Sequence, residues 1–447
     1  MAVMERPSSP GSPTFKSRFP ELEGLGLSED QKTYYDRFRF WRVVIVSSLF
    51  YSFYYLGRLN WGICLPWIID DLHITKTQAG LGATLLLWSY AAGTFLSGRL
   101  GETIGQRLLC AIGGVGTTIL NIAVALSSSL TGILVPWTIN GFIQGQAYAP
   151  INGMISNWYP RARRGMATGV FATSMGLSTI VAWAVTGFSA AAYGWRWAFI
   201  WPLVGLTLPL TLVMYFVSRN KPEEAGLPAY RETSGGITAQ AEELKHEQIA
   251  GVKAWVALFK NWKFMAMCVA SFSVYVARYG LLTWIPTFYK ETAHIALSKV
   301  PIMTFALPIG MAIGPVVSGW VSDTVFKAKR WQVIALNALV AAVILAVMGY
   351  VPIEKMGMTM AIVLQVIAGM VVLGVNGTLF TQACDFGGRK LAGTAVGTIN
   401  LFNYFGAGFQ GIIIGRILDV SGSWGMVWGF CAGLLAITVV LAVAVRE

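Results

Sequence analysis

Twelve long apolar segments, separated by short polar or charged loops, constrain this chain more than any other feature. None alternates in the manner of a strand, and each is long enough for a helix to cross the bilayer core, which takes about 20 residues. The sequence therefore predicts an all-α membrane protein with twelve transmembrane helices. The segments are 43–69, 78–97, 108–128, 132–156, 166–189, 197–217, 264–289, 302–321, 331–352, 358–383, 393–416 and 424–444.

Composition and charge agree with a multi-pass membrane protein. Only 12% of the residues are charged, about half the share in soluble domains. Of the 33 Lys and Arg residues, 25 lie in the N-terminal tail and in the loops on the same side, and 6 lie on the other side. The positive-inside rule then puts both termini in the cytoplasm, and we expect a bacterial inner (plasma) membrane. The surplus of positive charge reflects membrane topology, so we expect no nucleic-acid partner.

A polar segment divides the twelve predicted spans into six and six. We expect a cytoplasmic N-terminal tail at 1–42, a six-helix bundle at 43–217, a cytoplasmic linker at 218–263 with a surface helix near 239–253, and a second six-helix bundle at 264–447. The five cysteines lie far apart within spans and the three histidines lie in loops or the linker. We therefore expect no metal site, no cofactor, no catalytic residues and no enzymatic activity.

An internal repeat of about 220 residues relates the two predicted bundles. A Tyr-x-x-Arg pattern with a later proline occurs in the first and the seventh span at the same spacing. A glycine-led loop with an acidic residue follows the second and the eighth span, and a Gly-x-x-x-Gly pair opens the fifth and the eleventh. The matched residues are Tyr55, Arg58 and Pro66 with Tyr275, Arg278 and Pro286; Gly98 and Glu102 with Gly319 and Asp323; and Gly165 and Gly169 with Gly393 and Gly397.

Two charges, Arg58 and Arg278, remain inside the predicted spans. An arginine at a helix centre costs about 2.5–3.5 kcal/mol on the insertion scale, and no Asp or Glu lies inside any span to offset it. Two equivalent arginines without an acid predict an anion site. Tyr55 and Tyr275, three residues before each arginine, share its helix face and either contact the anion or pack in the core. The guanidinium fork suits phosphate, and the absence of acids argues against a cationic substrate and against proton-coupled export.

The paired bundles and the basic loop after the second span resemble the major facilitator superfamily. This resemblance implies two pseudo-symmetric six-helix halves, with the substrate held between them near the bilayer midplane. It also implies a cytoplasmic latch, for which Gly98, Glu102, Arg107 and Asp323 are the candidates.

Several stretches are similar to the organophosphate:phosphate antiporters, the family of glycerol-3-phosphate and hexose-phosphate transporters. They include 54–58, 144–145, 158–159, 222–228, 278–291, 392–397 and 403–404. The resemblance implies phosphate binding by Arg58 and Arg278, and rocker-switch exchange of an organic phosphate for inorganic phosphate. We expect the protein to be a monomer. It also implies a cavity lined by Tyr51, Tyr55, Tyr90, Tyr148, Tyr275 and Tyr404, although helix packing is an equal alternative for Tyr51, Tyr90, Tyr148 and Tyr404.

The chain departs from the family pattern at three positions, where Leu59, Thr94 and Met175 replace basic residues of well-known members. The predicted site is therefore less positive than in those members. Two alternatives stay open on this evidence: a symporter of carboxylates or sugar acids, and a membrane sensor of an extracellular organophosphate.

Overall fold

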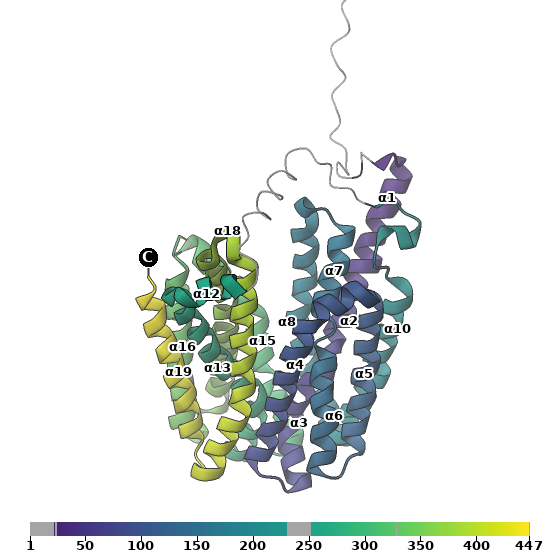
Figure 1. Ribbon diagram of the computed structural model, residues 1–447. Coiled ribbons are helices and arrows are strands. Elements are labelled where there is room, and N and C mark those ends of the chain that lie inside the picture. Colours follow the sequence, from purple (N-terminus) through teal and green to yellow (C-terminus); the bar gives the residue numbers. More distant parts are fainter. Residues whose placement is uncertain (1–21, 23–24, 230–251, 328, 447) are drawn as a thin grey trace, which may run out of the picture.

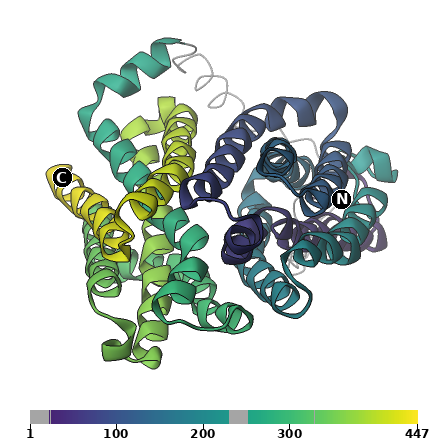
Figure 2. The ribbon, with the colours of Figure 1, turned by 90° about the horizontal axis from the view of Figure 1, so that it is seen from below.

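The computed structural model describes residue 22 and residues 25–229, 252–327 and 329–446, and these form helices joined by short turns. Most of the helix expected at 239–253 lies outside the described residues. Two helical bundles stand side by side, one built from the first half of the chain and the other from the second (Figure 1). Viewed along the helices, each bundle is a separate cluster and the two share one long interface (Figure 2).

The N-terminal bundle begins with a helix in the segment expected to be a polar tail. Ser28 caps this helix, α1, by accepting a hydrogen bond from the Gln31 amide, and Tyr35 of α1 packs edge-on against Trp158 with 5.7 Å between ring centroids. The elements of this bundle are α1 Glu29–Arg37, η2 Phe38–Ile45, α2 Val46–Tyr54, α3 Leu56–Leu72, α4 Lys76–Ile104, α5 Gln106–Leu126, α6 Leu130–Gln144, α7 Tyr148–Trp158, α8 Arg161–Tyr193, α9 Trp195–Pro202, η3 Leu203–Thr207, α10 Leu208–Val217 and η4 Pro222–Ala225.

The C-terminal bundle is centred on one unusually buried helix, α13, whose apolar side chains form much of the core. Its elements are α12 Val252–Lys260, α13 Trp262–Thr292, η5 Leu297–Lys299, α14 Val300–Thr304, α15 Ala306–Thr324, α16 Arg330–Tyr350, α17 Ile353–Met356, α18 Met358–Ser421 and α19 Trp424–Ala444.

Nine helices in the described part of the chain are long and apolar enough to cross a membrane, with the continuous helical runs Trp195–Val217 and Leu297–Thr324 each taken as one helix. They correspond to nine of the twelve predicted spans. The first and fourth predicted spans are each divided in the structure, between α2 and α3 and between α6 and α7, so neither forms one long helix. The eleventh predicted span is the second part of α18 and is more polar, with Asn400, Asn403 and Gln410 along it.

Helix α18 contains both the tenth and the eleventh predicted span, and the loop expected between them is helical. A straight helix of 64 residues would be about 96 Å long, twice the thickness of a bilayer. Its two parts pack on different partners, since Val366 lies against Gly310 of α15 whereas Gly411 lies against Gly80 of α4. Each part therefore serves as one membrane-length helix.

The two bundles approach closely along α4 and the second part of α18. A Cβ atom on Gly80 would meet the Gly411 carbonyl, so this crossing requires small residues. The Thr84 hydroxyl donates to the Gly408 carbonyl at 2.6 Å, and Trp88 stacks on Phe405 with 5.4 Å between centroids. This interface brings residues of both halves close together.

Ion pairs join the two halves at one end of the molecule, which the positive-inside rule predicts to face the outside. Lys290 pairs with Asp70, and the Lys76 ammonium lies 2.8 Å from the Glu291 carboxylate. The Asp419 carboxylate accepts hydrogen bonds from the amides of Lys76 at 3.0 Å and Thr77 at 2.8 Å, at the N-terminus of α4. From this end the bundles diverge toward the end that carries the C-terminus (Figure 1).

Candidate functional site

The first membrane helix breaks three residues before Arg58. Helix α2 ends at Tyr54 and α3 begins at Leu56. The Arg58 amide donates to the Tyr55 carbonyl at 3.1 Å, so the Tyr54 carbonyl, at the end of α2, loses its normal helical partner. Side chains of neighbouring helices donate to the backbone on both sides of the break. The Tyr54 carbonyl accepts from the Gln144 amide at 3.1 Å, and the Gly57 carbonyl accepts from Asn140 at 2.7 Å and from Asn121 at 3.2 Å.

A buried polar network links these three amides to one another. The Thr117 hydroxyl donates to Asn140 at 2.5 Å and accepts from Gln144 at 2.7 Å, and Asn60 donates to Asn121 at 2.8 Å. A Cβ atom at Gly57 would collide with Thr117 and Gln144, so the network approaches the backbone as closely as glycine allows. We call this set, Asn60, Thr117, Asn121, Asn140 and Gln144, the break network.

Arg58 leaves the start of α3 and is held between aromatic rings. Its side chain is only 8% exposed. The guanidinium carbon lies 3.7 Å from the centroid of the Tyr55 ring and 4.7 Å from that of Tyr90. Cation–π contact of this kind stabilises a guanidinium without neutralising it. The positive charge of Arg58 therefore remains able to attract an anion.

Arg278 occupies the equivalent position of the second half, but on an unbroken helix, α13. Its guanidinium carbon lies 5.3 Å from the Tyr275 ring centroid and 5.2 Å from that of Tyr279. Its Nε is buried and has no hydrogen-bond partner. A buried donor left without a partner costs about 1–3 kcal/mol, and a bound anion would relieve that cost.

A chain of tyrosine rings connects the two arginines across the interface. The Tyr404 ring lies 4.9 Å from Tyr90, which contacts Arg58, and 6.2 Å from Tyr275, which contacts Arg278. Within the described residues, neither arginine forms an ion pair with an acid. The structure thus brings together Arg58, Arg278, Tyr55, Tyr90, Tyr275 and Tyr404 at one place between the halves.

The remaining two predicted tyrosines extend this aromatic lining within the N-terminal half. Tyr51 lies 5.3 Å from Tyr55 and 6.0 Å from Tyr148 between ring centroids. Both also contact Phe171 of α8, at 5.1 Å and 5.8 Å. Tyr51 is buried whereas Tyr148 is 37% exposed, so the aromatic lining runs from the arginines toward an accessible face.

The four candidate latch residues lie near the ends of α4 and α15 that are farthest from the ion pairs between the two halves. Glu102 pairs with Arg99 on its own helix at 3.1 Å, and both side chains are largely exposed. The Arg107 amide donates to the Asn220 side chain at 2.7 Å, and its guanidinium donates to the Ser218 carbonyl at 3.3 Å beyond the end of α10. Gly98 and Asp323 are exposed. Glu102 and Arg107 therefore serve separate local contacts in this conformation.

Sequence reasoning missed three kinds of site residue. Tyr279 contacts Arg278 as closely as the predicted Tyr275 does, and its i,i+4 spacing from Tyr275 was the available signal. The amides of the break network were a second signal, because polar residues in the middle of apolar spans need partners. Leu282 and Thr283, which line a cavity beside Arg58, carried no signal.

Comparison with known proteins agrees with this architecture. Residues 47–411 match the family model described as Major Facilitator Superfamily. The chain is 30% identical over 422 residues to a probable hexose phosphate transport protein of Chlamydia pneumoniae, covering 91% of each chain. It is 26% identical to the membrane sensor protein UhpC of Escherichia coli, covering 86% of this chain and 87% of the relative. It is also 26% identical to a glycerol-3-phosphate transporter of Bacillus subtilis, covering 90% of each.

Solved structures support the same fold. A bacterial homologue of the human lysosomal transporter Spinster, in an inward-facing and unoccupied conformation, superposes with a TM-score of 0.71 at 15% identity, covering 94% of this chain and 96% of that one. These findings confirm the expected fold of two six-helix halves and make the chain an integral membrane protein. The chain belongs to the Major Facilitator Superfamily and, within it, to the organophosphate:phosphate antiporter family.

Proposed function

We propose that this protein exchanges a small phosphorylated metabolite for inorganic phosphate across the membrane. The observation that carries the proposal is the pair of arginines at equivalent positions of the two halves, Arg58 buried and Arg278 half-buried, without an acidic partner in the described part of the chain. The relatives' names, which specify hexose phosphate and glycerol-3-phosphate, support the same substrate class.

The chemistry of the site favours a phosphate group over other anions. Each guanidinium presents donors in a planar fork that matches two oxygens of a phosphate. A phosphate monoester near pH 7 carries almost two negative charges, which balances two arginines, whereas a single carboxylate balances one. The surrounding tyrosines supply further donors and no negative charge. Inorganic phosphate offers the same oxygens, so both exchanged species can occupy one site in turn.

Alternating access follows from where the halves meet. The ion pairs Asp70–Lys290 and Lys76–Glu291 close the end that positive-inside topology assigns to the outside. In our proposal these contacts separate when the halves rock about the arginine site, and the anion then reaches the opposite face. An anion held by one arginine from each half couples the rocking to binding.

Exchange can be measured with purified protein in liposomes loaded with inorganic phosphate. We expect labelled phosphate outside to enter only when phosphate or an organophosphate is inside, and we expect no dependence on a proton gradient. Arg196→Lys, on the outer surface beside Asp71, provides a matched control for arginine substitutions in the site. Uptake driven by a proton gradient without internal phosphate would instead support a symporter.

The similarity to the membrane sensor protein UhpC supports a second candidate, a sensor of an extracellular organophosphate. A sensor would bind phosphate esters with the same two arginines and would show saturable binding without exchange in the same liposomes.

A further inference from the structure

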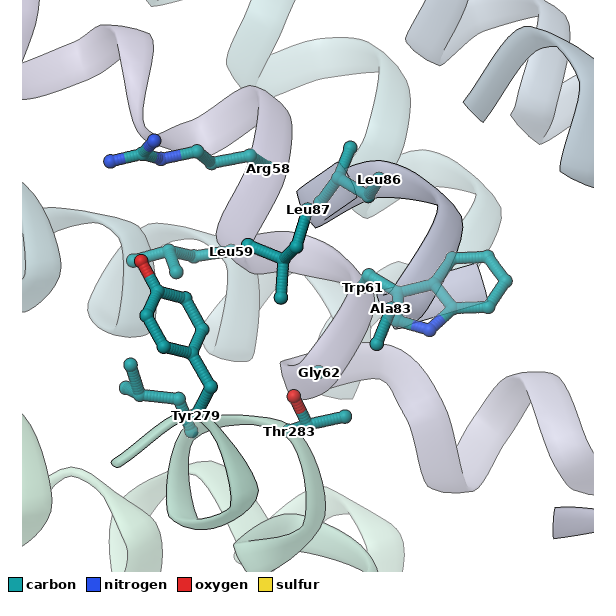
Figure 3. Close-up of a pocket in the computed structure, with 10 residues that line it drawn as sticks. Arg58, Leu59, Trp61, Gly62, Ala83, Leu86, Leu87, Tyr279 and Thr283 are labelled. Atoms are coloured by element: carbon teal, nitrogen blue, oxygen red, sulfur yellow. The ribbon is translucent and has the colours of Figure 1, made fainter. Parts of the chain in front are cut away.

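A small cavity lies beside Arg58 at the interface between the halves, bounded by α3, α4 and α13 (Figure 3). Arg58 and Tyr279 stand on one side of it, and the Tyr279 hydroxyl points toward the arginine. The remaining walls come from both halves of the protein. The lining residues are Arg58, Leu59, Trp61, Gly62, Ala83, Leu86, Leu87, Tyr279, Leu282 and Thr283.

The walls of this cavity offer few hydrogen-bonding groups. The Trp61 indole N–H donates to the Ala79 carbonyl at 3.2 Å, and the Thr283 hydroxyl accepts from Gln410 at 3.1 Å. Apart from Trp61, Thr283, Arg58 and Tyr279, the lining residues are leucines, alanine and glycine. A hydroxyl group placed deep in the cavity would therefore lose its hydrogen bonds to water and find few replacements.

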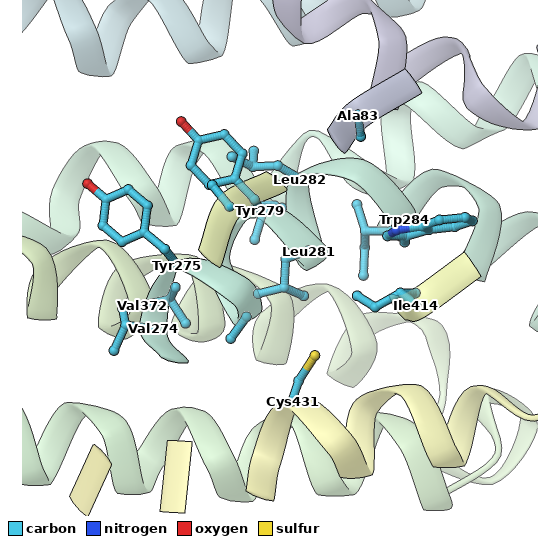
Figure 4. Packing of buried hydrophobic residues seen from close by; sticks show 14 of the residues in the cluster. Ala83, Val274, Tyr275, Tyr279, Leu281, Leu282, Trp284, Val372, Ile414 and Cys431 are labelled. Carbon is cyan, nitrogen blue, oxygen red and sulfur yellow. The ribbon is translucent and has the colours of Figure 1, made fainter. Parts of the chain in front are cut away.

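The cavity is small and its walls are firmly supported. Its volume is about 30 Å³, and a single buried water needs roughly 10–15 Å³ of such space, so two or three non-hydrogen atoms fit. Behind Tyr279 and Leu282, the side chains of Leu281, Ile414 and Cys431 pack closely (Figure 4). A hexose ring cannot enter this cavity unless the walls move.

We propose that this cavity is an apolar subsite for the carbon end of a compact organophosphate whose phosphate group lies between Arg58 and Arg278. The preferred substrate then has two or three carbons and no hydroxyl at the end remote from phosphate. This inference rests on the proposed function, since the phosphate must be held at the arginines for the carbon end to reach the cavity. Leu59, Leu86, Leu87 and Leu282 give the subsite its apolar character.

The subsite predicts a ranking of phosphate monoesters. Burying one methylene group contributes about 0.8 kcal/mol, or roughly fourfold in affinity. A buried hydroxyl without partners lowers affinity roughly 5- to 150-fold. n-Propyl phosphate and 2-hydroxyethyl phosphate have the same number of non-hydrogen atoms and differ mainly in that terminal group, so they form a matched pair of probes.

The test is inhibition of labelled phosphate exchange in phosphate-loaded liposomes by methyl, ethyl, n-propyl, n-butyl and 2-hydroxyethyl phosphate, and by glucose 6-phosphate. We expect inhibition to strengthen about fourfold per carbon up to propyl and to weaken at butyl. Propyl phosphate should inhibit at least fivefold more strongly than 2-hydroxyethyl phosphate. This comparison needs no variant protein.

Two variants sharpen the test. Leu59→Ala enlarges the cavity and should move the optimum from propyl to butyl phosphate. Leu59→Asn supplies an amide and should narrow or reverse the preference for propyl over 2-hydroxyethyl phosphate. Leu339→Ala is the control, because Leu339 lies on α16 and is 51% exposed; it should keep the wild-type ranking.

The outcomes separate the two proposals. Phosphate exchange with equal inhibition by propyl and 2-hydroxyethyl phosphate, or with glucose 6-phosphate as the strongest inhibitor, would overturn the apolar subsite and leave the exchange function standing. Absence of phosphate exchange would overturn both.

Discussion

Replacing Asn140 with leucine should impair anion binding although Asn140 does not touch the anion. Asn140 donates to the Gly57 carbonyl at 2.7 Å and accepts from the Thr117 hydroxyl at 2.5 Å. Leucine is close to asparagine in size but makes neither bond. The Gly57 carbonyl then keeps only the longer side-chain bond, from Asn121 at 3.2 Å, and the break network loses its shortest hydrogen bond to the backbone beside Arg58.

The size of the effect follows from the groups left without partners. A buried polar group that loses its partner costs about 1–3 kcal/mol. If the whole of that cost falls on the conformation that presents Arg58, phosphate affinity drops by roughly 5- to 150-fold. The C-terminal half offers a matched control, Ser271→Ala. Ser271 donates to Asn403 within the membrane, but α13 is unbroken there.

The assay compares thermal stability and phosphate affinity in purified protein. Both variants should lower the melting temperature, because each removes a buried hydrogen bond. Only Asn140→Leu should also weaken phosphate binding beyond fivefold. Wild-type phosphate affinity in a folded Asn140→Leu protein would refute the conclusion that the break network positions Arg58.

Three further predictions concern the contacts between the halves. Asp70→Lys places a second positive charge opposite Lys290 and should increase the labelling of a cysteine introduced at the outer face. The double variant Asp70→Lys with Lys290→Asp should restore the protection of that cysteine from labelling. Failure of the double variant to do so would contradict a direct pairing of the two residues. Burial raises the pKa of Asp419, but hydrogen bonds from Thr77 and Lys76 outweigh it and hold that pKa below its usual range. The ionised Asp419 carboxylate therefore stabilises the closed outer end at every pH above its usual pKa of about 3.9, and this stabilisation is lost as the pH falls through the lowered pKa. Labelling of the introduced cysteine should rise only at strongly acidic pH in the wild type. In Asp419→Ala it should already be raised at neutral pH. Gly80→Leu should slow exchange at least tenfold because its side chain meets the Gly411 backbone, whereas Gly433→Leu, where the added side chain meets open space, should exchange at the wild-type rate.

The fold was predictable from the sequence because the membrane imposes a simple pattern. Apolar length and the distribution of Lys and Arg depend on the bilayer and hardly on tertiary packing. The positions of the helix breaks were not predictable in this way. The break at Tyr55 lies in a run as apolar as its neighbours, and the amides that stabilise it, Asn121, Asn140 and Gln144, come from other helices.

The central residues of the site were also predictable, whereas its shape was not. Arg58 and Arg278 stand out because charge is costly in a membrane and the repeat places them at equivalent positions. The contact of Tyr404 with both Tyr90 and Tyr275 depends on how the two bundles dock. The same holds for the cavity beside Leu59, whose walls come from α3, α4 and α13.

The central claim is that the two arginines form one phosphate site, and phosphate affinity in Arg58→Lys and Arg278→Lys tests it most directly. Lysine keeps the positive charge and loses the planar fork. Loss of one hydrogen bond to a charged group costs about 1.5–3 kcal/mol, so each variant should bind phosphate roughly 10- to 150-fold more weakly than the wild type, while Arg196→Lys binds normally. Full phosphate affinity in either site variant would contradict the two-arginine site.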